Sequence, residues 1–209
     1  MGGQGDWPMW NDRYAGEDYL FGTEPSALLR HEAARLPPGA EVLSVAEGEG
    51  RNAVWLAGQG HKVTAVEAAP NALAKARRLA EARGVTLDLR EADIDRWDWA
   101  PEAFDAVLGI FIQFGDRAAQ DRIFAGMRQT LRPGGLVLLQ GYAPRQVGYG
   151  TGGPGDPEKM YTEPLLHDRF AGFEILLLRD YDTDLAEGRG HSGRSALVEM
   201  VARKPRPEG

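Results

Sequence analysis

The sequence has no cysteine, no long apolar run and no basic block, and each absence excludes a class of protein. Without cysteine there can be no disulfide, no thiolate zinc site and no cysteine nucleophile. No apolar run approaches the roughly 18 residues of a membrane span, and the polar N-terminus lacks the apolar region of a signal peptide. The formal net charge of −7 disfavours nucleic acid as a substrate. We therefore expect a cytoplasmic protein, a monomer or weak homodimer, that acts on a small molecule without a nucleic-acid or membrane partner.

The 209 residues are enough for one α/β domain with a sizeable core. Apolar runs typical of strands alternate with helical patterns, which predicts a parallel sheet with right-handed crossovers. Two further strands follow, and the last is expected to be antiparallel after a long connection. The pattern predicts a doubly wound, seven-stranded, mostly parallel sheet in residues 40–209, preceded by an N-terminal helical lid segment, residues 1–36. The expected strands are 41–46, 61–67, 85–91, 104–111, 136–142, 173–181 and 195–203.

One stretch organises the chain. The apolar run 42–46 ends in Glu47-Gly48-Glu49-Gly50, and a helical pattern follows at once. This order is typical of strand, tight turn and helix, because glycine tolerates positive φ and lets a ligand approach the backbone. Glu67 ends the next apolar run, where a carboxylate can accept both hydroxyls of a ribose. The two features together indicate a nucleoside cofactor.

With Glu91-Ala92-Asp93-Ile94 and the turn 131–135, these residues resemble the class I S-adenosylmethionine-dependent methyltransferases. The resemblance implies a Rossmann-like fold and S-adenosylmethionine as cofactor. Two positions depart from the family, which usually has an acid at Ser44 and a glycine at Ala46. Residues 10–16, 21–25 and 46–52 resemble, more narrowly, the tellurite-resistance and thiopurine methyltransferase branch. That branch methylates thiols and selenium and tellurium oxyanions, so the expected acceptor is a small molecule, a soft thiol, chalcogen or other small nucleophile.

The resemblance places the cofactor at the carboxyl ends of the strands. Acidic side chains there attract the sulfonium cation and disfavour a pyrophosphate. Methyl transfer is an in-line displacement, so the protein has mainly to position the reactants in a dry site. Asp93 could instead only cap a turn, and Phe111 could belong to the core. The expected cofactor-binding residues are Trp10, Tyr14, Glu47, Gly48, Glu49, Gly50, Asn52, Glu67, Ala68, Asp93, Ile94, Gly109 and Phe111.

Two segments could act as lids. Asp6 is expected to cap a short helix on which Trp7, Trp10 and Tyr14 share one face. These rings either dock the helix on the core or line the substrate pocket, and both can hold at once. The segment 148–155 has five glycines, and it is either a connector or a second lid.

The expected catalytic residues are Gln113, His191 and Arg194. Gln113, with Phe114, follows the fourth strand, where acceptor and methyl group should meet. His191 lies within the glycine-rich connection 187–193 and Arg194 directly follows it; this connection is either a solvated loop or part of the site. In the tellurite-resistance branch a histidine and an arginine in this region contact the anionic substrate. An arginine can bind an oxyanion in a fork, and a histidine titrates near neutrality.

Two other functions stay open. Gly48-x-Gly50-x-x-Ala53 with Glu67 also fits an NAD-dependent oxidoreductase, although the sequence has no Tyr-x-x-x-Lys dyad and no substrate domain. A methyltransferase-like fold can also serve as a non-catalytic binding module. No metal site is expected.

Overall fold

The computed structural model describes residues 7–207, with the backbone but not the side chain of Trp7. The expected Asp6 cap and the Trp7 ring lie outside the described residues. The α-helices are α1 (Trp7–Arg13), α2 (Ala27–Glu32), α3 (Arg51–Gly58), α4 (Pro70–Arg83), α5 (Arg117–Thr130) and α6 (Glu163–Arg169). Short 3-10 helices are η1 (Ala33–Arg35), η2 (Ile94–Arg96), η3 (Pro144–Gly148) and η4 (Pro157–Lys159). The strands are β1 (Glu41–Val45), β2 (Lys62–Glu67), β3 (Asp88–Glu91), β4 (Phe104–Ile110), β5 (Leu131–Tyr142), β6 (Glu174–Glu187) and β7 (His191–Arg203).

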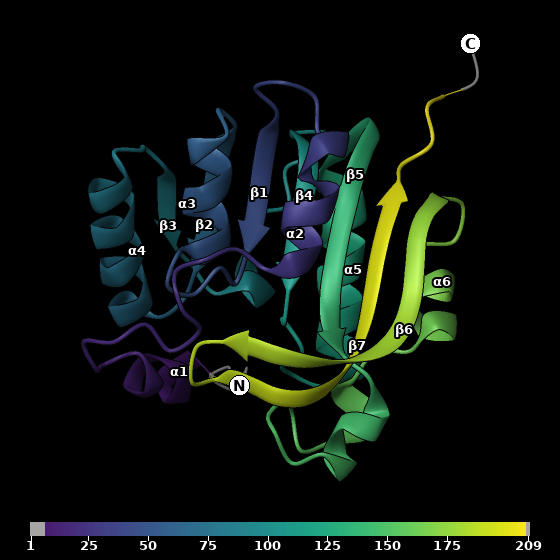
Figure 1. The fold of residues 1–209 in the computed structure, drawn as a ribbon. Coiled ribbons are helices and arrows are strands. Elements are labelled where there is room, and N and C mark those ends of the chain that lie inside the picture. Colours follow the sequence, from purple (N-terminus) through teal and green to yellow (C-terminus); the bar gives the residue numbers. More distant parts are fainter. Residues whose placement is uncertain (1–6, 208–209) are drawn as a thin grey trace.

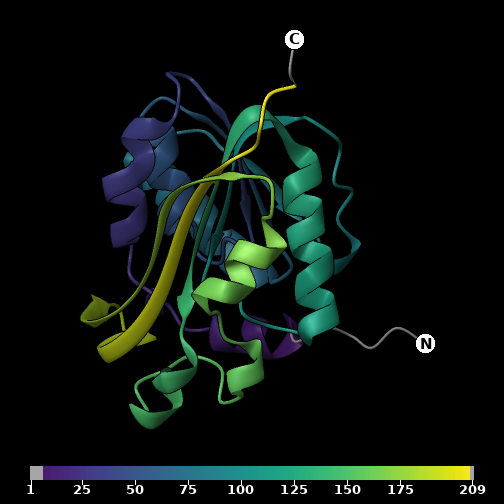
Figure 2. The same cartoon turned by 90° about the vertical axis from the view of Figure 1, so that its right-hand side faces the viewer.

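The strands form one seven-stranded sheet in the order β3-β2-β1-β4-β5-β7-β6. Neighbours from β3 to β5 pair in parallel, and β7 runs antiparallel to both β5 and β6. Helices cover both faces, with α2 and α3 on one side and α5 and α6 on the other (Figures 1 and 2). The predicted fold class is confirmed, including the antiparallel last strand.

The central strand β1 shows why this sequence folds as a sandwiched sheet. Val42 packs into the cluster under α2 and α3, while Leu43 and Val45 pack into the cluster under α5 and α6. A strand that is buried on both faces has to be apolar along most of its length, as this one is. The helix α5 begins as predicted, because the Asp116 side chain accepts a hydrogen bond from the backbone N–H of Ala119.

The predicted long connection before the last strand is wrong. Glu187 pairs with His191 across the ladder, so β6 and β7 form one long hairpin with a tight turn at residues 188–190. Gly188 has φ +72° and Gly193 has φ +100°, conformations that glycine adopts readily. The distal hairpin bends away from the sheet and passes beneath the carboxyl ends of the central strands toward α1 (Figure 1). Polar residues on this ribbon gave the sequence its loop-like pattern.

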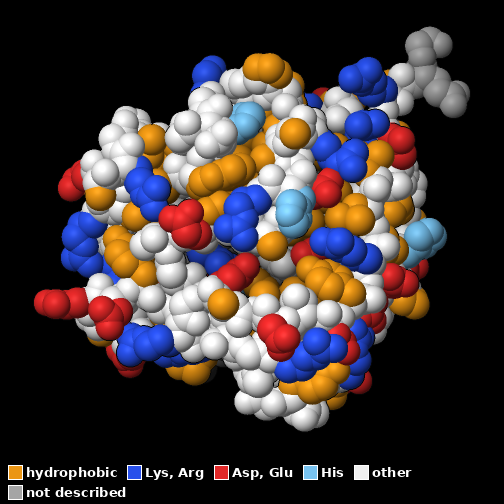
Figure 3. All heavy atoms as spheres, viewed as in Figure 1, with side chains coloured by type: hydrophobic (Ala, Val, Ile, Leu, Met, Phe, Trp, Pro, Cys, Tyr) orange, Lys and Arg blue, Asp and Glu red, His pale blue; other side chains and the backbone are white. Residues whose placement is uncertain are grey.

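Other differences concern strand ends. β3 starts at Asp88 rather than 85, and the pairing of β5 with β4 begins at Leu131 rather than 136, with a register shift between Phe104 and Ala106. None of the helices in residues 7–207 is long and apolar enough to cross a bilayer. The face seen in Figure 3 mixes acidic and basic side chains, with apolar ones between them.

Candidate cofactor and acceptor site

A cavity of about 390 Å³ lies at the carboxyl ends of β1, β2 and β4. Between β1 and β4 the strand order reverses, and this is where doubly wound sheets bind their ligands. The lining residues are Trp10, Tyr14, Phe21, Ala46, Glu47, Gly48, Arg51, Asn52, Glu67, Ala68, Ala92, Asp93, Ile94, Asp95, Ile110, Phe111, Phe114, Gly115, Asp116, Ala119, Arg122, Ile123 and His191.

Glu67 ends β2 inside this cavity. Its two carboxylate oxygens accept hydrogen bonds from the backbone N–H groups of Gly48 and Ala69, each at 2.8 Å. A carboxylate has about four acceptor positions, so roughly two are left for a ligand with paired hydroxyls. Burial raises the pKa of Glu67, and the backbone hydrogen bonds oppose that rise. The geometry suits a ribose.

The turn after β1 is built around Glu47. One Glu47 oxygen accepts from the backbone N–H groups of Asn52 and Ala53 at 2.9 Å, and the other accepts from the Ser44 hydroxyl. The carboxylate therefore caps the N-terminus of α3. Ser44, which stands where the related family usually has an acid, supports this cap. Burial raises the pKa of Glu47.

The glycines of this turn have different tasks. Gly48 lines the cavity with φ +68°, whereas Gly50 does not line it and has φ +93°. A Cβ at Gly50 would lie 2.8 Å from the Cβ of Ala76, so this glycine lets α3 approach α4. Ala46 adopts φ +47° where the family has its further glycine. Such a conformation costs a non-glycine residue roughly 1–2 kcal/mol, and strain of this kind gathers at functional sites.

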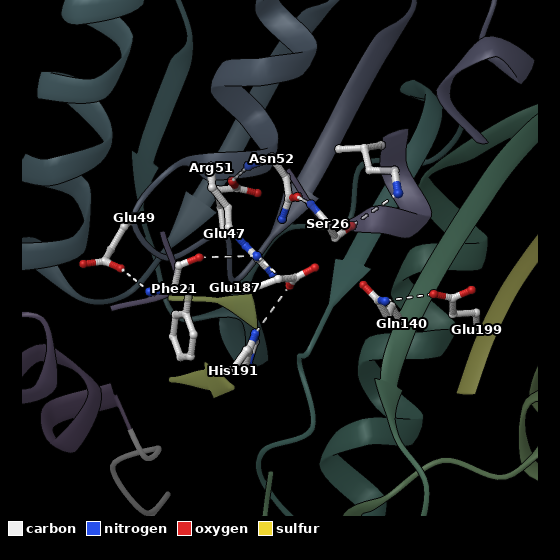
Figure 4. Close-up of polar contacts among 11 residues, drawn as sticks. Phe21, Ser26, Glu47, Glu49, Arg51, Asn52, Gln140, Glu187, His191 and Glu199 are labelled. Carbon is white, nitrogen blue, oxygen red and sulfur yellow. Dashed lines mark hydrogen bonds and ion pairs between the residues drawn. The ribbon is translucent and has the colours of Figure 1, made fainter. Parts of the chain in front are cut away.

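Aromatic side chains cover the cavity. Trp10 and Tyr14 are stacked with ring centroids 5.8 Å apart, and Phe21 lies 6.1 Å from Trp10. The segment that carries Phe21 is fixed from below by Glu49, which accepts from the backbone N–H of Leu20 at 2.7 Å and of Phe21 at 3.3 Å. Glu49 does not itself line the cavity, and its other oxygen is bonded to Lys75 (Figure 4 shows Glu49 pointing toward the Phe21 backbone).

The hairpin tip closes the opposite side. His191 lies between the rings of Phe21 and Phe111, with centroid distances of 4.3 and 4.0 Å. Its Nδ1 faces Glu187 at 3.8 Å, and Glu187 forms an ion pair of 2.7 Å with Arg51 (Figure 4). Burial alone would raise the pKa of Glu187, but the contacts with His191 and Arg51 lower it to about 2. Burial lowers the pKa of His191, and the nearby Glu187 carboxylate offsets only part of this decrease.

Two expected site residues on and after β4 do not line the cavity. Gln113 is buried, and its amide exchanges two hydrogen bonds with the backbone of Tyr142. A Cβ at Gly109 would lie 2.7 Å from Leu139, so this glycine permits core packing. Phe111 does line the cavity, and its φ of +58° is an outlier for a bulky residue.

Arg194 also lies away from the cavity. Its guanidinium is half exposed and lies 3.6 Å from Asp182. The structure therefore does not bring Arg194 and His191 to one crevice as expected. The two residues lie three positions apart on β7, and residues an odd number of positions apart on a strand point to opposite faces. The segment 148–155 packs on the same side, where the Thr151 hydroxyl donates to the Arg194 carbonyl. None of its residues lines the cavity.

Residues 42–135 match the family model of a methyltransferase domain. The match contains the turn after β1, Glu67, Asp93 and the end of β4, which together form most of the cavity. The similarity to a methyltransferase domain therefore includes most of the residues that form the cavity. This match, and the similarity to a relative named a methyltransferase, support the expected class, an S-adenosylmethionine-dependent methyltransferase.

Two curated relatives illustrate the similarity. An uncharacterized protein of Mycobacterium tuberculosis is 31% identical over 160 residues, which cover 73% of this chain and 57% of that protein. The demethylmenaquinone methyltransferase of Thermus thermophilus is 37% identical over 111 residues, which cover 51% of this chain and 49% of that enzyme. This chain therefore spans about half of the length of these relatives.

Solved structures extend the likeness over the whole methyltransferase fold. A structure from work on the conversion of a disulfide bond into a thioacetal group during echinomycin biosynthesis has a TM-score of 0.78 at 20% identity, covering 98% of this chain and 93% of that one. The N-methyltransferase NodS of Bradyrhizobium japonicum, in complex with S-adenosylhomocysteine, has a TM-score of 0.74 at 13% sequence identity. This match covers 97% of this chain and 100% of that one. TehB of Haemophilus influenzae has a TM-score of 0.69 at 18% sequence identity, and the match covers 95% of this chain and 67% of that one. At these identities the likeness shows the fold.

The expected site residues fall into two groups according to whether they line this cavity. Those that line it are Trp10, Tyr14, Glu47, Gly48, Asn52, Glu67, Ala68, Asp93, Ile94, Phe111 and His191. Those that do not are Glu49, Gly50, Gly109, Gln113 and Arg194. Asp93 lines the cavity and also caps η2 by accepting from the Asp95 N–H, so the capping role does not take it away from the cavity.

The sequence analysis missed Arg51, Glu187 and Lys75. Lys75 could have been found, because it lies among alanines and leucines on the buried face of α4. Arg51 and Glu187 are 136 residues apart, and nothing in either local pattern indicates that they meet.

Proposed function

We propose that this chain transfers a methyl group from S-adenosylmethionine to a small-molecule acceptor, with a soft nucleophile such as a thiol or a chalcogen as the first choice. The observation that carries the proposal is the Glu67 carboxylate, held by two backbone N–H groups at the cavity with acceptor positions to spare. The acceptor class rests on the resemblance to the tellurite-resistance and thiopurine branch.

The cavity residues fit the cofactor from end to end. Glu67 would take the ribose hydroxyls, Asp93 and Ile94 would meet the adenine, and the turn at Gly48 would meet the methionine portion. Bound there, S-adenosylmethionine supplies an electrophilic methyl group on a sulfonium. The protein's own part is to orient the reactants and, through Trp10 and Tyr14, to keep water out. We propose accordingly that residues 7–36 cover the site as a lid on a single domain.

The N-terminus of α3 argues against a dinucleotide. In dinucleotide sites the pyrophosphate sits on the free N–H groups of this helix. Here the Glu47 carboxylate already accepts from the N–H groups of Asn52 and Ala53. A pyrophosphate would have to displace a buried carboxylate and would meet negative charge. A cationic sulfonium meets no such conflict.

The test is binding followed by turnover. S-Adenosylhomocysteine at about 100 times its Kd should stabilise the protein by roughly 2.7 kcal/mol and raise Tm by roughly 5–10 °C, whereas NAD should not. A screen with labelled S-adenosylmethionine across thiols, thiopurines, selenite, tellurite and small amines then identifies the acceptor. Stabilisation by NAD and none by S-adenosylhomocysteine would reject the proposal. Binding without transfer to any acceptor would favour the non-catalytic module.

A cytoplasmic location and a monomeric or weakly dimeric state belong to the same proposal. Both rest on composition. Gel filtration at several protein concentrations tests the second.

A further inference from the structure

The His191 imidazole is held more firmly than a surface histidine would be. The rings of Phe21 and Phe111 lie on either side of it at 4.3 and 4.0 Å, and Tyr142 meets it edge-on at 5.9 Å. The Nδ1 edge turns toward Glu187, and the Nδ1 atom has no hydrogen-bond partner among the described residues. Because His191 lines the cavity, the Nε2 edge on the opposite side of the ring is the one left for a ligand.

Glu187 is in turn fixed by a charge. Arg51 donates to it at 2.7 Å, and the same guanidinium nitrogen also approaches the Phe21 carbonyl at 3.4 Å. Carboxylate and guanidinium are both largely buried, so their geometry is well defined. The 3.8 Å separation between Glu187 and His191 is longer than a hydrogen bond. Such contacts in ligand-free sites commonly shorten when substrate binds.

The charges around the cavity disfavour an anionic acceptor. Of the described residues, two cations line it, and each is already paired: Arg51 with Glu187 and Arg122 with Asp95, both at 2.7 Å. Five carboxylates line the same space: Glu47, Glu67, Asp93, Asp95 and Asp116. An oxyanion entering here would meet net negative charge and no unpaired guanidinium.

We propose that His191 is the general base of the reaction, that Glu187 and Arg51 position it, and that the acceptor is a neutral thiol rather than an oxyanion. This inference rests on the proposed methyltransferase function. In the step, the S–H bond of the acceptor breaks and an N–H bond forms at His191 Nε2. The electron pair stays on the acceptor sulfur, which would form a new bond to the methyl carbon. The bond from that carbon to the sulfonium would break, its electron pair would go to the sulfonium sulfur, and neutral S-adenosylhomocysteine would be the leaving group. The Glu187 carboxylate faces the imidazolium that forms, and the proton leaves later to solvent.

A thiol suits this base better than a hydroxyl. The thiol proton, with a pKa of about 8.5, is within reach of an imidazole, and sulfur is a strong nucleophile once ionised. The groups that face His191 determine its protonation. Burial, the largest effect, keeps the pKa of His191 below its usual range; Glu187 favours the charged form, and Arg51 and Arg13 disfavour it. A neutral imidazole at pH 7 is the form that can accept a proton.

The kinetic test compares two thiols: an aromatic thiol that is largely ionised at pH 8 and an alkyl thiol that is not. His191→Gln should lower kcat/KM for the alkyl thiol by about 100-fold or more. The loss with the aromatic thiol should be at least tenfold smaller, because that acceptor needs no base. Glu187→Gln should lower the alkyl-thiol rate by about tenfold and change its pH profile. His167→Gln, on an exposed position of α6, is the matched control.

A second measurement does not depend on turnover. The ¹⁵N spectrum of labelled histidine, assigned with His191→Gln, should show a neutral His191 at pH 7 with its proton on Nδ1. In Glu187→Gln the pKa of His191 should fall and the preference for the Nδ1–H tautomer should weaken. Binding of S-adenosylhomocysteine, measured by calorimetry, should persist in both variants.

Each alternative outcome overturns the proposal. Equal losses with both thiols would make His191 a packing residue. Selenite methylated faster than either thiol would reject the neutral acceptor, as would a protein that binds S-adenosylhomocysteine and methylates neither thiol. A charged His191 at pH 7, or a proton on Nε2, would reject the base. Failure to bind S-adenosylhomocysteine at all would instead reject the proposed function.

Discussion

Glu49 and Lys75 form an ion pair of 2.7 Å, with both side chains only 2% exposed, directly beneath the segment that covers the cavity. Lys75 also donates to the Asp18 carbonyl at 2.6 Å, and Glu49 accepts from the backbone N–H of Leu20. One buried pair therefore joins the turn after β1, helix α4 and the N-terminal segment. Glu49 was expected to contact the cofactor, but in the structure it holds these three segments together and does not line the cavity.

Removing one partner of this pair should be costly. Lys75→Met leaves the Glu49 carboxylate buried without its cation, which should lower the free energy of unfolding by about 3–5 kcal/mol. The double variant Glu49→Gln with Lys75→Met should recover part of that loss, because no charge is then stranded. Urea unfolding of the three proteins measures both effects.

The exposed pair Arg83–Glu24 offers a control, since its side chains are 51% and 65% exposed. Arg83→Ala should cost no more than about 1 kcal/mol. A Lys75→Met protein as stable as Arg83→Ala would show that the buried pair is not needed.

Glu187 should make the fold sensitive to acid. Its folded-state pKa of about 2 lies below the ordinary 4.5, so it contributes stability above pH 4.5 that is lost as the pH falls through about 2. At neutral pH the contribution is at most about 3 kcal/mol. Thermal unfolding of the parent and of Glu187→Gln should therefore differ most at neutral pH and converge toward pH 2.

Glu47 and Glu67 act in the opposite sense. Burial raises the pKa of each, so their stabilising effect is present at low pH and is lost as the pH rises through the folded-state value. Glu47 and Glu67 are present in both the parent and Glu187→Gln. The difference between the two curves of thermal stability against pH therefore reports the contribution of Glu187 alone. Curves that stay parallel from pH 7 to pH 2 would contradict its lowered pKa.

Glu67→Gln should weaken the binding of S-adenosylhomocysteine by about tenfold, measured by calorimetry. The amide keeps the size of the side chain but loses the charge that strengthens hydrogen bonds to ribose hydroxyls. Glu91→Gln, at the exposed end of β3, is the control and should bind like the parent. Unchanged affinity in Glu67→Gln would place the ribose elsewhere.

The fold could be predicted well from the sequence, because its signals are local. The run 42–46, the cap at Asp116 and the helix Pro70–Arg83 each carry their own periodicity or capping residue, and all three appear in the structure. The strand and turn motif also placed Gly48 and Glu67 at the cavity, because the carboxyl ends of parallel strands meet at one edge.

The acceptor side could not be predicted in the same way. Its geometry depends on a hairpin whose outer half is a polar two-stranded ribbon, so the alternation typical of a strand was weak there. Pairing Glu187 with His191, rather than leaving both in a loop, turns Arg194 toward Asp182 and brings Glu187 to Arg51. Contacts between residues 136 positions apart leave no trace in a local pattern.

The hairpin, found where a loop was expected, reverses one expectation about catalysis. As a loop residue Arg194 would bind the acceptor, and its loss would lower kcat/KM by tenfold or more. On β7 it lies half exposed beside Asp182, outside the cavity, so Arg194→Ala should leave kcat/KM within about twofold of the parent. Arg51→Ala is the informative partner, because it strands the buried Glu187 carboxylate and releases the hairpin tip. It should cost about 3–5 kcal/mol of stability and most of the activity. Stopped or slowed turnover in Arg194→Ala, with Arg51→Ala unaffected, would mean that the hairpin adopts another register when the acceptor is bound.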